Sequence, residues 1–111
     1  MDNNKNIIDI EDYRGKRIIF TYKKWKQKSI THPELCNKIF LKNLKETIRK
    51  PEEVWQDYSD KKCKRCYYKK YSVNSYVKVI IWTYSNPCHV ITAFETNQIK
   101  EVQYPKLKPL L

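Results

Sequence analysis

The residues best placed to do chemistry lie around one histidine. His32 stands in the string Thr31-His32-Pro33-Glu34, four residues after Lys28. A helix N-terminus attracts phosphate, and a histidine held there can act as a general acid or base. Metal-free RNA cleavage needs a base for the 2′-hydroxyl, a cation for the phosphate oxygens and an acid for the leaving oxygen. His32, the lysines and the tyrosines offer candidates for all three, although a histidine at a helix start is also an ordinary structural residue.

A second candidate is the basic, aromatic segment 61–70. Lysine or arginine fills six of its ten positions, with Tyr67 and Tyr68 among them. Cations neutralise phosphates and aromatic rings stack on unpaired bases, so the segment predicts nucleic-acid binding. An edge strand protected from aggregation by lysines has the same composition. The cations are Lys61, Lys62, Lys64, Arg65, Lys69 and Lys70.

The four cysteines have two interpretations. Cys63 and Cys66 precede one predicted strand and Cys88 and His89 begin another, so an antiparallel meander brings them to one sheet edge. Two cysteines with a Cys-His pair are ligands that suit zinc. Neighbouring strand residues point to opposite faces, however, which makes joint ligation by Cys88 and His89 awkward. We expect no cofactor, with a structural zinc as the alternative, and we expect Cys36 in the core.

Composition limits the function classes. The 111 residues suit one domain, and 23 basic against 12 acidic residues give a net charge of +11, which favours a polyanionic partner. A 41% apolar content is too high for a disordered basic tail, and one glycine argues against a glycine-rich phosphate loop. We find no apolar run that could span a membrane and no secretory signal, so we expect a cytoplasmic protein.

One helix is predicted to follow residue 31. Thr31 and Glu34 have the spacing of a capping box, which already explains Glu34 without a catalytic role. Pro51 predicts the helix end at Arg49 or Lys50. The expected buried stripe is Cys36, Phe40, Leu44 and Ile48, with Asn37 and Leu41 beside it.

Strands are predicted on both sides of this helix. Residues 17–22 form a leading strand, and three runs at 66–71, 76–84 and 88–94, joined by short links, form an antiparallel meander. In the middle run, Val77, Val79 and Ile81 share one face. Alternation also places Thr92 on the face of Val90 and Phe94, toward the helix if those two pack there.

The remaining segments complete the predicted organisation. Residues 1–15 hold a third of the acidic residues and are interpreted as a solvated acidic arm, and 16–111 as the domain. Segment 52–60 fits a helical turn or a strand, and 104–111 reads as loop. The predicted fold class is α+β: one main helix, with room for a second short one, on a four-stranded antiparallel sheet.

The order of several short motifs resembles the barnase–EndoU–colicin–RelE-like nuclease group, in its phage-associated branch. The resemblance covers about Phe20 to Lys100. The motifs are Lys28–Leu35 with its His-Pro-Glu helix start, Ile48–Val54, Tyr67-Tyr68-Lys69, Val77–Ile81, and Val90–Thr96 with its Thr-Ala-Phe-Glu-Thr end.

This resemblance implies one or two helices followed by a four-stranded sheet, and metal-independent RNA cleavage by a toxin or phage-defence protein. RNA, such as tRNA or mRNA, would be the substrate and an acidic antitoxin a partner. The implied site residues are His32 as acid or base, Lys28 as phosphate cation, Tyr68 and Lys69 on one strand, and Thr92 and Thr96 on the last. The alternative is a basic RNA- or DNA-binding module without catalysis, with or without a structural zinc.

Overall fold

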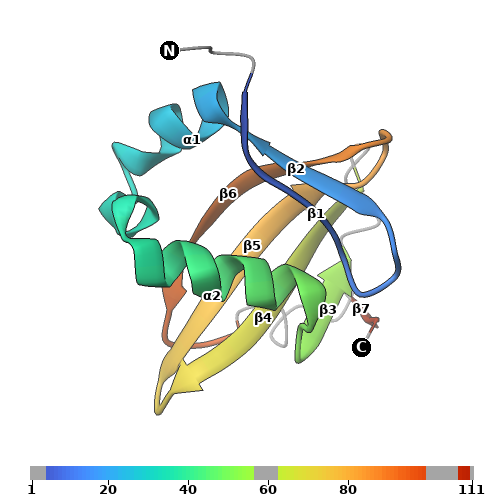
Figure 1. The fold of residues 1–111 in the computed structure, drawn as a ribbon. Coiled ribbons are helices and arrows are strands. Elements are labelled where there is room, and N and C mark those ends of the chain that lie inside the picture. The colour runs from blue at the N-terminus through green and yellow to red at the C-terminus, as the bar shows by residue number, and fades with distance from the viewer. Residues whose placement is uncertain (1–4, 57–62, 100–107, 111) are drawn as a thin grey trace.

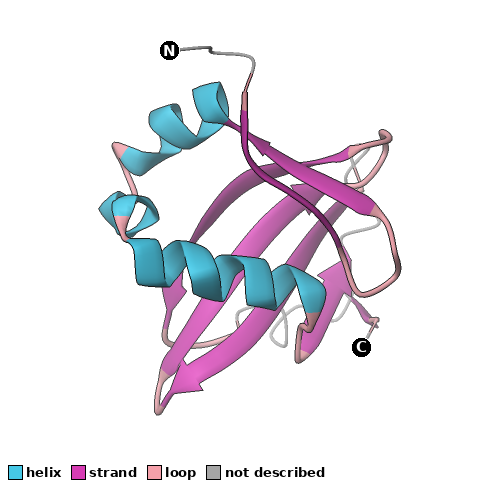
Figure 2. Ribbon diagram, in the orientation of Figure 1, coloured by secondary structure: helices cyan, strands magenta, loops and turns pink. Residues whose placement is uncertain are grey.

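The computed structural model describes residues 5–56, 63–99 and 108–110, which form one curved sheet with helices against it (Figures 1 and 2). The helical segments are α1 (Tyr22–Ser29), the 3₁₀ turn η1 (Pro33–Cys36) and α2 (Lys38–Arg49). The strands are β1 (Asn6–Glu11), β2 (Arg17–Thr21), β3 (Glu53–Gln56), β4 (Lys64–Ser72), β5 (Ser75–Trp82), β6 (Cys88–Thr96) and β7 (Lys108–Pro109). Their order across the sheet is β1-β2-β6-β5-β4-β3-β7.

The α+β class and the main helix are confirmed, but the prediction of four strands is wrong. Within the described residues seven strands pair, although β7 has only two residues. The meander β4–β5–β6 forms as predicted, with antiparallel pairing throughout. The β1–β2 hairpin adds to it through a parallel pairing of β2 with β6, and β3 and β7 extend the other edge.

Two of the additional strands come from segments predicted to lack structure. The solvated arm is wrong for Asn6–Glu11, because Ile8 is buried in the core and Ile7 and Ile10 pack against it. The C-terminal loop is wrong at Lys108–Pro109, which pairs with β3. The ambiguous segment 52–60 contains strand β3, and its residues 57–60 lie outside the described ones.

The predicted capping box is wrong. His32, not Thr31, is the N-cap of the short η1 turn, and no side chain caps it. The α2 helix begins later, at Lys38, where the Asn37 side chain accepts hydrogen bonds from the backbone of the first turn. The end at Arg49 is as predicted. We attribute the late start to Asn37, because asparagine caps a helix better than threonine.

The buried stripe of α2 is largely as predicted. Phe40, Leu44 and Ile48 are buried and join the main core. Cys36 is exposed, contrary to the prediction, because it lies in η1 before α2 begins. The helix lies across the inside of the curved sheet, where it meets β1, β4 and β5 (Figure 1).

The α1 helix was not predicted, because it has no apolar stripe and buries no residue completely. Thr21 caps it by accepting from the backbone N–H of Lys24 at 3.2 Å. Its Trp25 indole donates to the carbonyl of Leu35 at 2.8 Å, which ties α1 to η1. In the described parts of the chain, no helix has the length and apolar character needed to cross a membrane.

The sheet separates side chains onto an α2 face and a far face, which we define as the face turned away from α2. On β5, Val77, Val79 and Ile81 are buried on the α2 face, as predicted. A bulge at Ile91 changes the alternation of β6, since Ile80 pairs with Thr92 but Ile81 pairs with Val90. The far face therefore carries Tyr68 of β4, Tyr76, Lys78 and Ile80 of β5, and Thr92, Phe94 and Thr96 of β6.

Candidate active site

His32 lies between α1 and α2, at the start of η1. Its backbone N–H donates to the carbonyl of Lys28 at 2.9 Å, at the end of α1. Its imidazole stacks on the ring of Phe94, with centroids 4.8 Å apart and planes 18° apart. The imidazole of His32 therefore contacts the far-face side chains of β6. The ring on which it stacks belongs to Phe94, 62 residues later in the chain.

Glu34 fixes η1 to the end of β6. Its carboxylate accepts the backbone N–H of Glu95 at 3.2 Å, one residue beyond the ring that His32 covers. The two contacts act together, because one orients the histidine ring and the other holds the turn that carries it. Glu34 therefore holds η1 against β6, whereas the sequence predicted that it caps a helix.

Lys78 is the most buried cation of the far face, with 8% of its surface exposed. Its Nζ lies 5.2 Å from the ring centre of Tyr68 and 5.8 Å from that of Phe94. Both distances are within reach of cation–π attraction. Lys78 and His32 therefore contact the same ring, Phe94. Sequence reasoning missed Lys78, although it alternates with the buried valines of β5.

Tyrosine and lysine continue this row along β4 and β5. Tyr68 meets Tyr76 edge to face, with ring centroids 6.4 Å apart. Lys70 places its Nζ 5.9 Å from the ring centre of Tyr76. An alternation of rings and cations across neighbouring strands suits a ligand with both bases and phosphates.

Thr92 carries a buried polar group without a partner. Its Oγ1 is enclosed and makes no hydrogen bond within the described residues. Thr92 and Phe94 lie on the far face whereas Val90 is in the core, so the prediction that all three share one face is wrong, because of the β6 bulge. Thr96 follows on the same face, where its hydroxyl donates to the carbonyl of Gln98 at 3.3 Å.

The structure brings only some of the predicted site residues together. His32 shares the far face with Tyr68, Thr92 and Thr96, and Tyr68 is fully buried there. Lys69 pairs with Val77 and thus belongs to the α2 face, away from His32. Lys28 is linked to His32 through the backbone at the end of α1.

The predicted binding segment 61–70 is also divided between the faces. Lys64 and Lys70 pair with Trp82 and Tyr76 of β5, on the far face. Arg65 points the other way and donates to Gln56 at 3.1 Å. Lys61 and Lys62 lie outside the described residues.

Tyr67 belongs to the core, which corrects its predicted role in nucleic-acid binding. It is fully buried, and its hydroxyl donates to Asp12 at 2.6 Å. Burial and the neighbouring carboxylate raise the pKa of this phenol well above its usual range. Asp12 also accepts from the backbone N–H groups of Arg14 and Lys16 and pairs with the Arg14 guanidinium at 3.0 Å. Gly15, with φ +82°, lets the hairpin turn tightly around this carboxylate.

Within the described residues, which include Cys63, Cys66, Cys88 and His89, no group of three or more His, Cys, Asp or Glu side chains could hold a metal ion. Cys88 is buried in the core, and burial raises the pKa of its thiol. Its neighbour His89 pairs with Trp82 on the far face, so the two point apart as expected from strand alternation.

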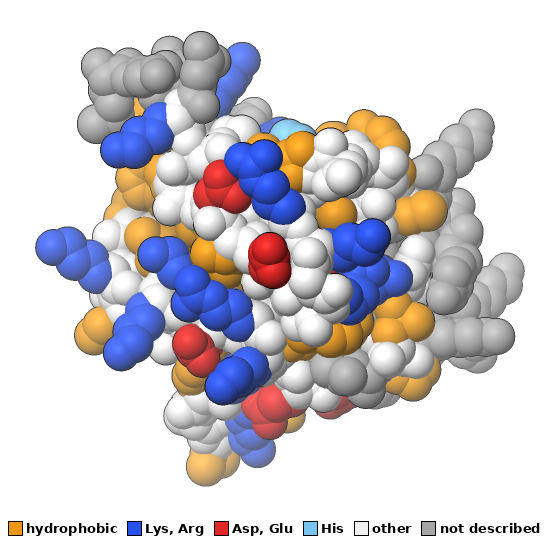
Figure 3. Space-filling view, turned by 45° about the vertical axis from the view of Figure 1, so that its right-hand side comes forward, with side chains coloured by type: hydrophobic (Ala, Val, Ile, Leu, Met, Phe, Trp, Pro, Cys, Tyr) orange, Lys and Arg blue, Asp and Glu red, His pale blue; other side chains and the backbone are white. Residues whose placement is uncertain are grey.

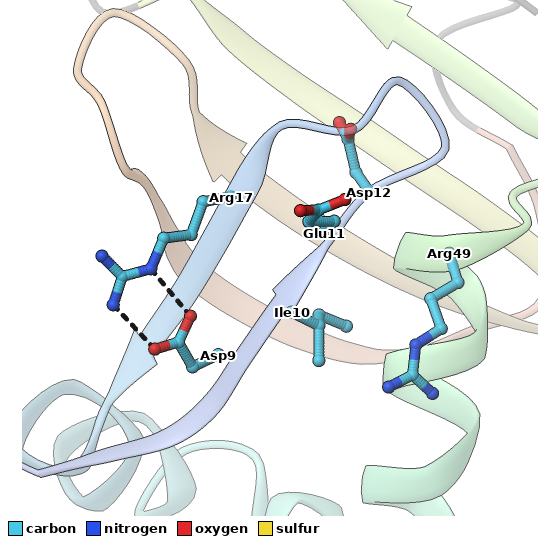
Figure 4. A pocket seen from close by; sticks show the side chains of 6 residues that line it. All are labelled: Asp9, Ile10, Glu11, Asp12, Arg17 and Arg49. Atoms are coloured by element: carbon cyan, nitrogen blue, oxygen red, sulfur yellow. Dashed lines mark hydrogen bonds and ion pairs between the residues drawn. The ribbon is translucent and has the colours of Figure 1, made fainter.

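A cavity of about 690 Å³ lies elsewhere, between β1 and the end of α2 (Figure 4). Asp9, Glu11, Asp12 and Arg17 line one side of it, and Arg49 lies across from them. Arg17 is held by Asp9 in a two-fold hydrogen-bonded pair, at 2.7 and 2.9 Å. Three carboxylates repel phosphate, so this cavity is a poor site for nucleic acid.

Comparison with protein-family models matches residues 5–107 to the phage-Barnase-EndoU-ColicinE5/D-RelE like nuclease 2 family. The chain belongs to this nuclease family. The match covers nearly all described elements and confirms the resemblance noted from the motifs. Searches of the curated proteins and of the solved structures returned no match. Membership makes nucleic acid the substrate class, which agrees with the net charge of +11.

Proposed function

We propose that the protein is a metal-independent endoribonuclease with its active site on the far face, beside His32. The observation that carries this proposal is the His32 imidazole stacked on Phe94, with buried Lys78 over the same ring. The chain is basic and belongs to a nuclease family. In phosphoester transfer, a histidine can move the proton and a buried cation that contacts the same aromatic ring can stabilise the charge.

In the proposed reaction, His32 takes the proton of an RNA 2′-hydroxyl. The 2′-oxygen forms a bond to the adjacent phosphorus, the bond from phosphorus to the 5′-oxygen breaks, and that oxygen takes up a proton from an acid. The products are a 2′,3′-cyclic phosphate and a 5′-hydroxyl. Because the attacking 2′-oxygen and the phosphate belong to the same nucleotide, the protein contributes mainly by positioning the reacting groups and stabilising charge. DNA lacks the 2′-hydroxyl and resists.

Other far-face residues receive roles that follow their positions. Lys78 offers positive charge to the phosphate oxygens, a role that Lys69 on the opposite face cannot fill. Thr92, whose enclosed hydroxyl has no partner within the described residues, lies on the same face of β6 as Thr96, and we propose that both border the RNA. Tyr76 and exposed Lys70 are candidates for the acid. The ring of Tyr68 contacts the ammonium group of Lys78 and helps to hold it in place.

The biological setting is part of the proposal. A cytoplasmic ribonuclease that cuts tRNA or mRNA stops growth, which suits a toxin with an acidic antitoxin or a phage-defence protein. The family model supports the nuclease role and the net charge supports an acidic partner.

The test is incubation of the purified protein with total RNA in excess EDTA, followed by analysis of fragment ends. We expect 2′,3′-cyclic phosphate ends, and intact DNA of the same sequence. His32→Ala should abolish cleavage. His89→Ala is the matched control, because it removes the only other histidine, at the opposite end of β6, and should leave the fragments unchanged.

Two results would contradict the proposal. Cleavage that stops in EDTA would contradict metal independence. Equal cleavage by wild type and His32→Ala would remove the histidine from the reaction. Intact RNA that nevertheless binds the protein tightly would favour the binding module.

A further inference from the structure

Helix α2 presents a row of cations on its outer side. Lys38, Lys42, Lys45 and Arg49 follow one another at intervals of four, three and four residues. At 3.6 residues per turn these positions lie within about 60° of one another around the helix, and the row is about 16 Å long. We call these four residues the α2 strip.

None of the four strip residues forms an ion pair within the described part of the chain. The ion pairs there are Asp12 with Arg14 and Asp9 with Arg17, and the strip takes part in neither. The only acid in α2 is Glu46. Lys38, Lys42 and Arg49 are exposed and Lys45 is half-buried. Figure 3 shows Lys and Arg side chains spread over the face of the molecule to which α2 belongs.

The composition of the strip distinguishes between two kinds of polyanion. Protein interfaces have cores rich in aromatic residues and depleted in lysine. The strip has no aromatic residue, and Ile39 is the exposed large apolar residue among the described residues of α2. Tyr71 of β4 contacts α2 at Asn43 and Thr47, which are not part of the strip. Lysines at regular intervals suit a chain of phosphates, because binding to phosphates requires positive charge and no shape-complementary apolar surface.

We infer that the α2 strip binds the phosphate backbone of single-stranded RNA, as a contact separate from the far-face site. The choice of RNA rests on the proposed function. The strip lies on the opposite side of the sheet from Lys78 and Phe94, so an RNA strand bound at both places passes around an edge of the domain. Lys38, Lys42 and Lys45 carry the contact, since Arg49 also borders the acidic cavity of Figure 4.

The test is the salt dependence of binding to fluorescein-labelled poly(U), measured in a His32→Ala background so that cleavage does not interfere. Each phosphate that a lysine neutralises makes the slope of log K against log salt steeper, so losing three such contacts lowers the magnitude of the slope by about 2 for single strands. We expect this drop for the triple variant Lys38→Gln, Lys42→Gln, Lys45→Gln. Replacing the same three lysines by arginine should keep the slope, which separates lost charge from a disturbed helix.

The matched control removes three exposed lysines from other parts of the chain, with Lys5→Gln, Lys16→Gln and Lys23→Gln. It lowers the net charge equally, and we expect less than half of the slope change. Equal changes in both triple variants would overturn the inference and leave only a general effect of charge. An unchanged RNA slope with lost binding to a polyglutamate peptide would overturn it in favour of an acidic protein.

The outcomes also separate this inference from the proposed function. If the slope falls but wild-type protein never cleaves RNA, the strip stands and the ribonuclease proposal fails. If cleavage depends on His32 but the two triple variants behave alike, the ribonuclease proposal stands and the strip fails.

Discussion

The two faces of the sheet differ in how completely their buried polar groups are hydrogen-bonded. On the α2 face, buried Asp12 accepts from Tyr67, from Arg14 and from two backbone N–H groups. On the far face, the enclosed hydroxyl of Thr92 has no partner within the described residues. A fully bonded buried group stabilises the native state, whereas an unbonded one costs free energy. This difference agrees with the proposed function, in which the α2 face maintains the fold and the far face meets the RNA.

The largest effect should come from His32→Phe. Phenylalanine can keep the stack on Phe94 but cannot transfer a proton. We expect RNA cleavage to fall by about 10²- to 10⁴-fold, the usual contribution of a general acid or base, with little change in thermal stability. Cleavage assays and calorimetry on the same preparation measure both. A large loss of stability with retained cleavage per folded molecule would assign His32 a structural role.

Asp12→Ala should be the most destabilising change on the α2 face. It leaves the buried Tyr67 hydroxyl and the partly buried Arg14 without their shared acceptor. Breaking such a buried network costs about 3 kcal/mol of unfolding free energy, which urea denaturation would measure. Asp9→Ala is the control, because its pair with Arg17 is solvent-exposed and its loss should change the unfolding free energy much less. Equal losses would remove the distinction between the two pairs.

Asp12 also predicts how stability depends on pH. Burial raises the pKa of this carboxyl, but hydrogen bonds from Tyr67, Lys16 and Arg14 outweigh it, and the pKa lies below the usual value. A lowered native pKa means that the stabilisation is present above about pH 4, the unfolded pKa, and is lost as the pH falls through the native one. Denaturation series from pH 6 to about pH 2 should show a smaller decline for Asp12→Asn than for wild type.

Thr92→Val should give the smallest effect on stability and the opposite sign. Valine has nearly the same shape and removes an unbonded hydroxyl, so we expect a gain of up to about 1 kcal/mol with weaker RNA cleavage. Thr83→Val is the matched control, since Thr83 donates to the carbonyl of Cys63 at 2.6 Å and should lose about 1 kcal/mol. Destabilisation by Thr92→Val would show that this hydroxyl has a partner in solution.

Regular periodicity made part of this fold predictable. Leu44 and Ile48 recur at helical spacing, and the short links of the meander allow only antiparallel neighbours, so these elements formed where expected. The start of the helix was mispredicted because Thr31 and Glu34 have the spacing of a capping box, although Asn37 is the better N-cap residue. The carbonyl of Lys28, at the end of α1, already accepts from the N–H groups of both Thr31 and His32.

The candidate site was less predictable because strand pairing determines it. His32 was identified from its residue type, but Lys78 and Phe94 become its neighbours only through the β5–β6 register. Motif adjacency predicted Tyr68 and Lys69 together, although consecutive strand residues must face opposite ways. The bulge at Ile91 has no local signal, and it determines which face Thr92 occupies.

The contact between Glu34 and Glu95 spans 61 residues of chain. At a synthesis rate of about 5–20 residues per second, the strand that receives η1 emerges roughly 3–12 s after the turn itself. The β1–β2 hairpin waits for the same strand, because β2 pairs directly with β6. A growing chain therefore holds its histidine without the ring and backbone that orient it. The far-face site is assembled only after β6 has been synthesised.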